Sequence, residues 1–143
     1  MLSAAGHQVV ITARYAYGFG ESGVNCLAQQ TPRAPYRRQP ALWARACRRL
    51  TLKALALTRQ TGGKTALLLN LASLCHPSRT AFWQRNRPAR IYAIDAVVCW
   101  PEHRYGQAPD VFTRHRYCWV VWSPDHHGAP SFGWLSAGDF RSG

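Results

Sequence analysis

Apolar residues recur at helical spacing in the middle of this chain and at strand spacing in its last third. Between residues 40 and 59 they occur every three or four positions, which predicts an amphipathic helix with Pro40 in its first turn. Gly62 and Gly63 follow this pattern and end the helix. The apolar side of the helix comprises Trp43, Cys47, Leu50, Ala54 and Leu57.

Two further helices are expected after the glycine pair. Residues 64–75 (KTALLLNLASLC) are apolar on nearly all sides, which predicts a helix buried in the core. A His-Pro pair ends this segment. Ser78 is then suited to cap a short third helix from residue 79 to about residue 86, ahead of a proline.

Strands are predicted on both sides of these helices. Residues 8–17 (QVVITARYAY) are rich in β-branched and aromatic side chains, which predicts one strand. Turn-forming residues separate three later segments that have the same character: 91–100, 111–122 and 131–135.

These elements predict an α+β fold: a strand, a three-helix segment of the helix-turn-helix kind, and then a three-stranded antiparallel sheet. The length of 143 residues suits one compact domain. Its parts would be an N-terminal strand and basic linker (1–39), a helical basic module (40–90) and a small antiparallel sheet (91–143).

The charge of the chain is concentrated in one segment. Residues 22–94 contain no aspartate or glutamate in 73 positions, while they include eleven arginines and two lysines. The net charge of +12 therefore lies in this segment. Because a surface of one sign repels itself and a polyanion relieves that repulsion, nucleic acid is the first partner to consider. Arginine outnumbers lysine by 16 to 2, which suits phosphate contacts, although codon usage in a GC-rich genome also explains the ratio.

The helix predicted at 40–59 has a basic side opposite its apolar side. At 100° per residue its basic residues fall within an arc of about 140°. No acidic residue stands at an i,i+4 position to relieve their repulsion. This arrangement predicts a side that faces phosphate groups or a membrane surface, formed by Arg45, Arg48, Arg49, Lys53 and Arg59.

The cysteines and the hydropathy indicate a reducing, cytoplasmic compartment. Five cysteines are scattered and odd in number, which argues against a secreted disulfide framework. No signal peptide is expected. The longest uncharged run in the basic segment has 14 residues, over 65–78, and a bilayer span takes about 20. No membrane-spanning segment is therefore expected.

Three short sequence words stand in the same order as in a family of phage regulators: GGKTALL (62–68), SRTAFW (78–83) and RPAR (87–90). They resemble the words Gly-Gly-Gln-Ser-Ala-Leu, Ser-Arg-x-x-Val-x-x-Trp and Arg-x-Pro-Ala-Arg of the small Cro and YdaS-like regulators. The resemblance covers about residues 50–96. The chain departs from the family in a longer segment between the first two words, in a His-Pro pair where the family has a Gly-Val turn, and in a tryptophan two positions early.

This resemblance implies a helix-turn-helix that binds DNA and regulates transcription. Ala81 and Phe82 would then face the core, and Arg87 and Arg90 would hold backbone phosphates. No cofactor is expected. The side chains facing the major groove would be Arg79, Thr80, Gln84 and Arg85.

A zinc site is a weaker hypothesis, since Cys-x3-His followed by His-x2-Cys offers four ligands at spacings that zinc accepts. The TGGKT sequence is not a phosphate-binding P-loop, because Thr58 stands where that loop needs a glycine. The candidate zinc ligands are Cys99, His103, His115 and Cys118.

Two alternatives to a DNA-binding regulator stay open. One is a small basic RNA-binding or RNA-cleaving protein of the toxin kind, with general-base and phosphate-binding groups. The other is a non-enzymatic interaction protein, in which tryptophans beside arginines stack on single-stranded bases, or an open reading frame of little selected function. The pattern favours a binding protein over an enzyme and DNA over RNA, with residues 91–143 serving a homodimer or another partner. The residues for RNA cleavage would be His103, Arg104, His115, Arg116 and Tyr117.

Overall fold

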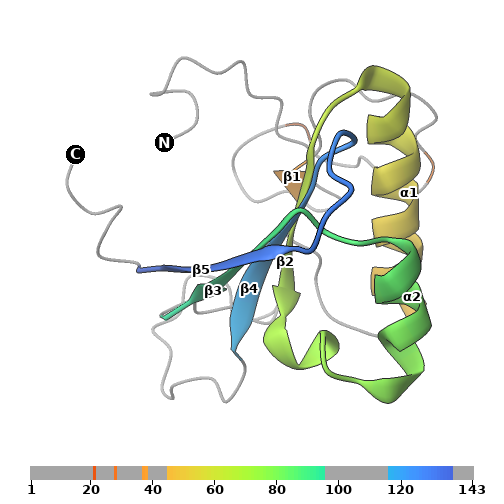
Figure 1. Ribbon diagram of the computed structural model, residues 1–143. Coiled ribbons are helices and arrows are strands. Elements are labelled where there is room, and N and C mark those ends of the chain that lie inside the picture. Colours follow the sequence, from red (N-terminus) through yellow and green to blue (C-terminus); the bar gives the residue numbers. More distant parts are fainter. Residues whose placement is uncertain (1–20, 22–27, 29–36, 39–44, 96–115, 137–143) are drawn as a thin grey trace. The chain divides into compact units, whose positions relative to one another are not determined.

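Figure 1 shows the computed structural model of the chain, which describes residues 21, 28, 37–38, 45–95 and 116–136. The chain divides into two units, and each is described by itself. The first comprises Met1–Arg37 and Ala41–Thr65, and the second comprises Arg38–Pro40 and Ala66–Gly143. The strand predicted over residues 8–17 lies outside the described residues.

Helix α1, Arg45–Thr61, is the main described element of the first unit. Leu50, Ala54 and Leu57 are buried along one side of it, at the three- and four-residue spacing that the sequence shows. The predicted helix and this part of its apolar side are therefore confirmed. Residues 40–44, where the helix was expected to begin, lie outside the described residues.

Helix α1 ends in a glycine turn, as predicted. Gly62 has a φ of 65°, a left-handed conformation that glycine adopts without steric cost. Gly63 N donates to Thr58 O at 3.1 Å, which is the hydrogen bond of a Schellman C-terminal motif. The Thr58 hydroxyl also shares a hydrogen bond of 2.7 Å with the hydroxyl of buried Thr65, so two buried polar groups on either side of the turn satisfy each other.

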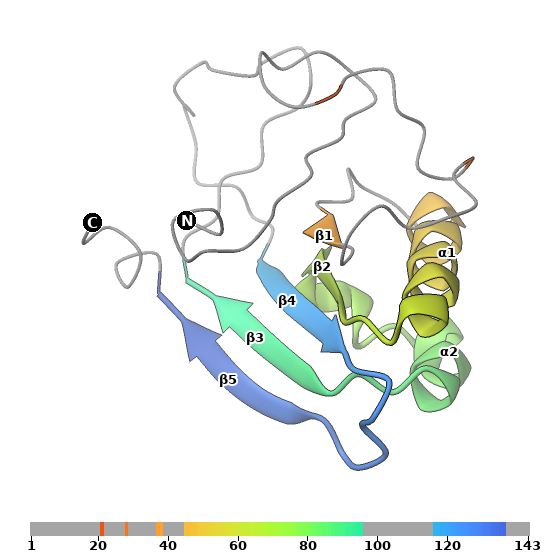
Figure 2. The ribbon, with the colours of Figure 1, turned by 90° about the horizontal axis from the view of Figure 1, so that it is seen from above.

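A mixed sheet forms the second unit, with its strands in the order β1-β2-β4-β3-β5 (Figure 2). β3 (Arg90–Ile94) is antiparallel to β4 (Tyr117–Trp122) and parallel to β5 (Ser131–Leu135). β2 (Thr65–Asn70) lies between β4 and the two-residue strand β1 (Arg37–Arg38).

The second predicted helix, over residues 64–75, is wrong. Its first half is strand β2, and a 3-10 turn at Leu71–Ser73 follows. The leucines of β2 are all buried, so both faces of the strand are covered. A strand covered on both faces has the same continuous apolar sequence as a buried helix, which is why the pattern misled. Asn70 ends the strand, since its Oδ1 accepts a hydrogen bond from Ala72 N at 2.9 Å.

The predicted three-stranded antiparallel sheet is also wrong, because β5 runs parallel to β3 and the sheet includes β2. The connection over residues 123–130 passes the start of β3 instead of turning back beside β4. Ala89, just before β3, bonds to both neighbours: its N donates to Val121 O at 2.8 Å, and its O accepts from Ser131 N at 3.0 Å. Strand β3 thus lies between β4 and β5 and pairs with both. No local sequence pattern indicates this strand order.

The three-helix segment of the helix-turn-helix kind is not formed. A 3-10 turn at Pro77–Arg79 leads into helix α2, Thr80–Arg85, which has six residues. Ser78 does not cap α2, because its backbone N and its hydroxyl lie 3.2 and 2.8 Å from His76 Nδ1 and bond there. Between α1 and α2 the chain forms strand β2 and two 3-10 turns, so α2 has no partner helix of the predicted kind. The expected helix-turn-helix arrangement is therefore wrong.

Helix α2 packs on one face of the sheet through two tryptophans. Trp83 stacks on Trp122 of β4, with ring centroids 6.2 Å apart and planes at 12°. Trp122 Nε1 donates to Asn86 O at 2.9 Å, and Trp83 Nε1 donates to Ser73 O at 3.2 Å. We call this side of the sheet the α2 face. By strand alternation it includes two fully buried residues of β4, Cys118 and Val120.

Candidate nucleic-acid interface

Helix α1 has a cationic side opposite its buried side. Arg48, Arg49 and Arg59 are exposed, and Lys53 is half-buried. At 100° per residue these four residues lie within an arc of about 140°. We call them the α1 cationic face. Arg45 belongs to the same helix, and its side chain lies outside the described part of the structure.

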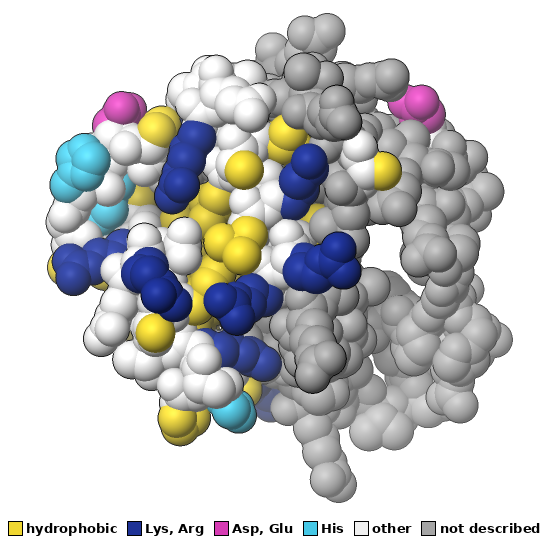
Figure 3. All heavy atoms as spheres, turned by 90° about the vertical axis from the view of Figure 1, so that its right-hand side faces the viewer, with side chains coloured by type: hydrophobic (Ala, Val, Ile, Leu, Met, Phe, Trp, Pro, Cys, Tyr) yellow, Lys and Arg dark blue, Asp and Glu magenta, His cyan; other side chains and the backbone are white. Residues whose placement is uncertain are grey.

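The charges of this face are not neutralised within α1. The helix contains no aspartate or glutamate, and neither do residues 22–94. The carboxylates among the described residues are those of Glu21, Asp95 and Asp125. Figure 3 shows the basic side chains in dark blue at the surface. Because the repulsion among the four cations is not relieved within the helix, an anionic ligand on this face would stabilise it.

The residues predicted to face the major groove lie in the second unit. Thr80, Gln84 and Arg85 are exposed on α2. Arg79 is half-buried instead, and its Nη1 donates to Ser73 O at 3.4 Å. This contact holds the Arg79 guanidinium against the protein backbone. The structure therefore brings three of the four residues to the surface, on a helix of less than two turns.

The two arginines predicted to hold phosphates, Arg87 and Arg90, are both exposed. Arg90 Nη1 donates to Tyr92 OH at 3.2 Å, which leaves other guanidinium N–H groups for a ligand. These residues belong to the second unit and the α1 cationic face to the first. We therefore treat them as two separate surfaces.

Only Cys118 of the zinc candidates belongs to the described residues; the other three lie outside them. It is fully buried in β4. Burial, and secondarily the electrostatic effect of nearby Cys75, raises the pKa of Cys118 from 9.0 to about 12. In the segments that the structure describes, no group of three His, Cys, Asp or Glu side chains could hold a metal ion. In these surroundings Cys118 is a neutral core residue.

The stability of the fold is expected to fall between about pH 9 and pH 12 because of Cys118. The unfolded thiol loses its proton near pH 9, whereas the folded thiol keeps it up to about pH 12. In this window the folded state therefore binds more protons than the unfolded state, and raising the pH destabilises it. The stabilisation from the protonated thiol is complete only below pH 9. We expect wild type to lose about 2–3 kcal/mol more than Cys118→Ala between pH 8 and pH 11 in urea titrations. Equal losses would show that the thiol ionises as freely in the folded state as in water.

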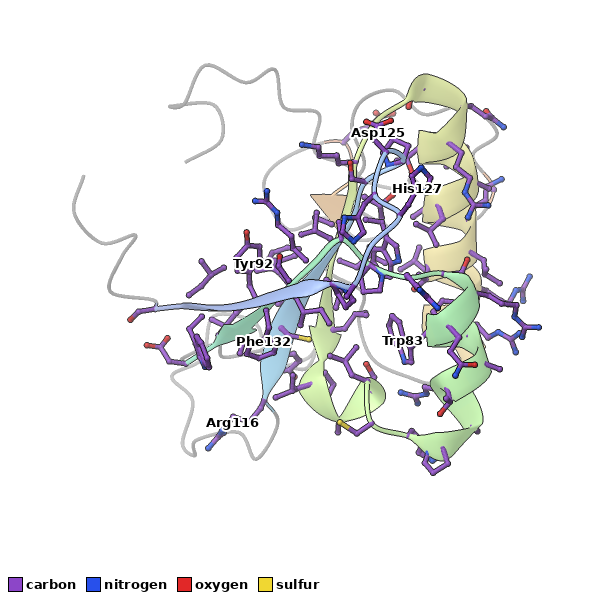
Figure 4. The ribbon with its side chains drawn as sticks, in the orientation of Figure 1. Trp83, Tyr92, Arg116, Asp125, His127 and Phe132 are labelled. Carbon is purple, nitrogen blue, oxygen red and sulfur yellow. The ribbon has the colours of Figure 1, made fainter. Side chains whose placement is uncertain are left out.

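The residues predicted for RNA cleavage are only partly described. Arg116 is exposed at the start of β4, where Figure 4 labels it. Tyr117 is buried, so its side chain is not presented to a ligand. The other three, His103, Arg104 and His115, lie outside the described residues.

One exposed tryptophan could not be distinguished in the sequence from those of the core. Trp122 is buried and Trp83 and Trp119 are half-buried, whereas Trp134 is 79% exposed. Phe132, two residues before it on β5, is also exposed. The order Phe-Gly-Trp in a strand indicates that the two rings share one face, because residues two apart point to the same side, but it does not indicate whether that face is buried or exposed.

No protein-family model, curated protein or solved structure matches this chain. The resemblance to the Cro and YdaS-like regulators over residues 50–96 stays a prediction from the sequence. Among the described residues, no helix is long and apolar enough to cross a membrane.

Proposed function

We propose that this chain is a small basic protein that binds nucleic acid through the α1 cationic face. The observation that supports this most strongly is the grouping of four cations on one side of a helix without a single carboxylate. Three of the four are arginines, which donate two parallel hydrogen bonds to a phosphate. From Arg48 to Arg59 the face extends about 16 Å along the helix axis, enough for several successive phosphates.

A membrane surface is the other anionic partner that the sequence allowed. A helix that lies on a membrane inserts its apolar side into the lipid. In α1 that side is buried within the protein, since Leu50, Ala54 and Leu57 are each buried. Among the described residues of α1, the one exposed large apolar side chain is Leu52. Nucleic acid fits this helix better, because it needs the charges and not the apolar side.

The proposal concerns phosphate contacts, which DNA and RNA share. Reading of base edges by a helix-turn-helix is not part of it, because that arrangement is not formed. Regulation of transcription stays a prediction from the sequence. A cytoplasmic, reducing location belongs to the proposal and agrees with the free thiols of Cys75 and Cys118. A homodimer through residues 91–143 stays a prediction from the sequence.

Fluorescence anisotropy with random duplex DNA and with single-stranded RNA, between about 50 and 300 mM salt, tests the proposal. We expect affinity to fall steeply with salt, with a log–log slope of about −0.9 per phosphate contact on duplex and −0.7 on single strands. Sedimentation of the same samples measures the stoichiometry and any homodimer. Intact RNA after binding would argue against the RNA-cleaving alternative. Absence of binding to both probes at 50 mM salt would overturn the proposal.

A further inference from the structure

Strand β5 is the outermost strand on its side of the sheet in the described part of the chain, and it exposes two aromatic side chains. Trp134 is 79% exposed and Phe132 is 53% exposed. Aromatic side chains usually bury most of their surface, and buried aromatic area is a large contribution to stability. Two neighbouring rings left in water are therefore a feature that requires an explanation.

Both rings project from the α2 face of the sheet. Phe132 is in register with Ile91 of β3, and Trp134 is in register with Ala93. Residues directly opposite each other in a sheet point to the same face. Burial on this face decreases strand by strand, from buried on β4 through half-buried on β3 to exposed on β5. The β4 partners of the two β3 residues are Val120 and Cys118.

The opposite face of β5 is occupied by the protein itself. A β-carbon on Gly133 would lie 3.2 and 3.3 Å from two ring carbons of Tyr92, so the Tyr92 ring lies close over the backbone of β5. Figure 4 shows Tyr92 and Phe132 on opposite sides of the sheet. Because Gly133 has no side chain, the Tyr92 ring can pack against the backbone of β5. The two residues next to Gly133, Phe132 and Trp134, project from the other face of the sheet.

The two exposed rings hold each other in a defined orientation. Their centroids are 5.2 Å apart and their planes meet at 81°, which is an edge-to-face contact. Because the planes are almost perpendicular, one flat ligand cannot stack on both. Trp134 is the more exposed of the two and offers the larger ring face. Phe132 is a positioning residue, since its contact restricts the orientation of the indole.

The size and the charge of this surface fit a nucleobase better than a protein. The exposed parts of the two rings amount to about 300 Å², from 150–250 Å² for a whole aromatic side chain. A stable protein interface takes about 800 Å² from each partner. A second copy of this chain would also bring together two net charges of +12. A base covers one ring face, and its phosphate has the opposite charge to the protein.

We infer that Trp134 stacks on an unpaired base, so that the nucleic acid bound by this protein is single-stranded. Within a duplex each base face is covered by its neighbours, whereas every unpaired base has a free π-face for an aromatic ring. The inference rests on the proposed function, since it names the ligand class for the same protein. Arg87 is exposed and precedes Ala89 by two residues, and Ala89 O accepts a hydrogen bond from Ser131 N at the start of β5.

Two oligonucleotides of equal length and charge test the inference on the full chain: oligodeoxythymidine and its abasic counterpart. At equal salt, wild type is expected to bind the strand with bases about 5- to 150-fold more tightly than the abasic strand. Trp134→Leu should remove this difference and leave the affinity for the abasic strand unchanged. Trp134→Tyr keeps an aromatic ring and should retain most of the difference. Thermal unfolding of both variants checks that replacing an exposed side chain leaves the fold intact.

The possible outcomes distinguish a failure of this inference from a failure of the proposed function. Equal binding of both strands by wild type would overturn the inference and leave phosphate binding standing. If Trp134→Leu lowered the affinity for both strands equally, the inference would also be overturned. Trp134 would then contribute to binding whether or not the strand carries bases. A lower sedimentation mass for Trp134→Leu than for wild type would identify a second copy as the occupant, with the same consequence. Absence of binding to either strand would overturn the proposed function itself.

Discussion

Replacing Arg48, Arg49 and Lys53 together by glutamine is expected to weaken binding to nucleic acid of any sequence by about 10²- to 10³-fold at 50 mM salt. Each lost phosphate contact removes about 0.7–0.9 from the log–log salt slope, so three contacts lower it by about 2–3. The loss should shrink as salt rises, because salt screens these contacts in wild type too. Anisotropy titrations at four salt concentrations measure both the affinity and the slope.

A matched control removes the same number of charges outside residues 22–94. Replacing Arg14, Arg114 and Arg141 by glutamine lowers the net charge of +12 by the same three units. If the α1 cationic face contacts the phosphates, this second triple variant should keep most of the wild-type salt slope. Equal losses in the two variants would mean that the overall charge attracts nucleic acid and that helix α1 has no special part in it.

Replacing Leu67 by alanine is expected to lower the free energy of unfolding by about 3–5 kcal/mol, the largest single-site loss of stability that we predict. Leu67 is fully buried at the centre of β2, and a close-packed interior relaxes only partly into the cavity that the substitution leaves. Chemical denaturation of the two proteins, with equal m values, measures the difference.

Leu52 provides the matched control for Leu67, because it is the same residue type and is 42% exposed on α1. Leu52→Ala should cost less than about 1 kcal/mol, since little apolar surface is removed from a packed site and alanine favours a helix. Similar losses in the two variants would contradict the burial of β2. The pair therefore tests the burial of this segment, which a buried strand and a buried helix would share.

The features that the sequence determined by itself depend on neighbouring residues only. The missing carboxylates between residues 22 and 94 are a property of the chain in any fold. Helix α1 was predictable because its apolar residues recur at helical spacing and Gly62 can adopt the left-handed turn that ends it. Strands β4 and β5 were predictable from β-branched and aromatic residues between turns, and β5 was predicted with its observed limits.

The features that only the tertiary structure decided depend on residues far apart in the chain. Strand β2 is a strand because β4 pairs with it, and its leucines alone are equally compatible with a buried helix. The order of β3, β4 and β5 rests on contacts such as the one between Ala89 and Ser131, 42 positions apart. Likewise, Trp122 Nε1 donates a hydrogen bond to Asn86 O, 36 positions away, while Trp134 is 79% exposed. A buried tryptophan and an exposed tryptophan cannot be distinguished in the sequence. Only the packing of distant segments determines which hydrophobic residues are buried and which stay exposed to a ligand.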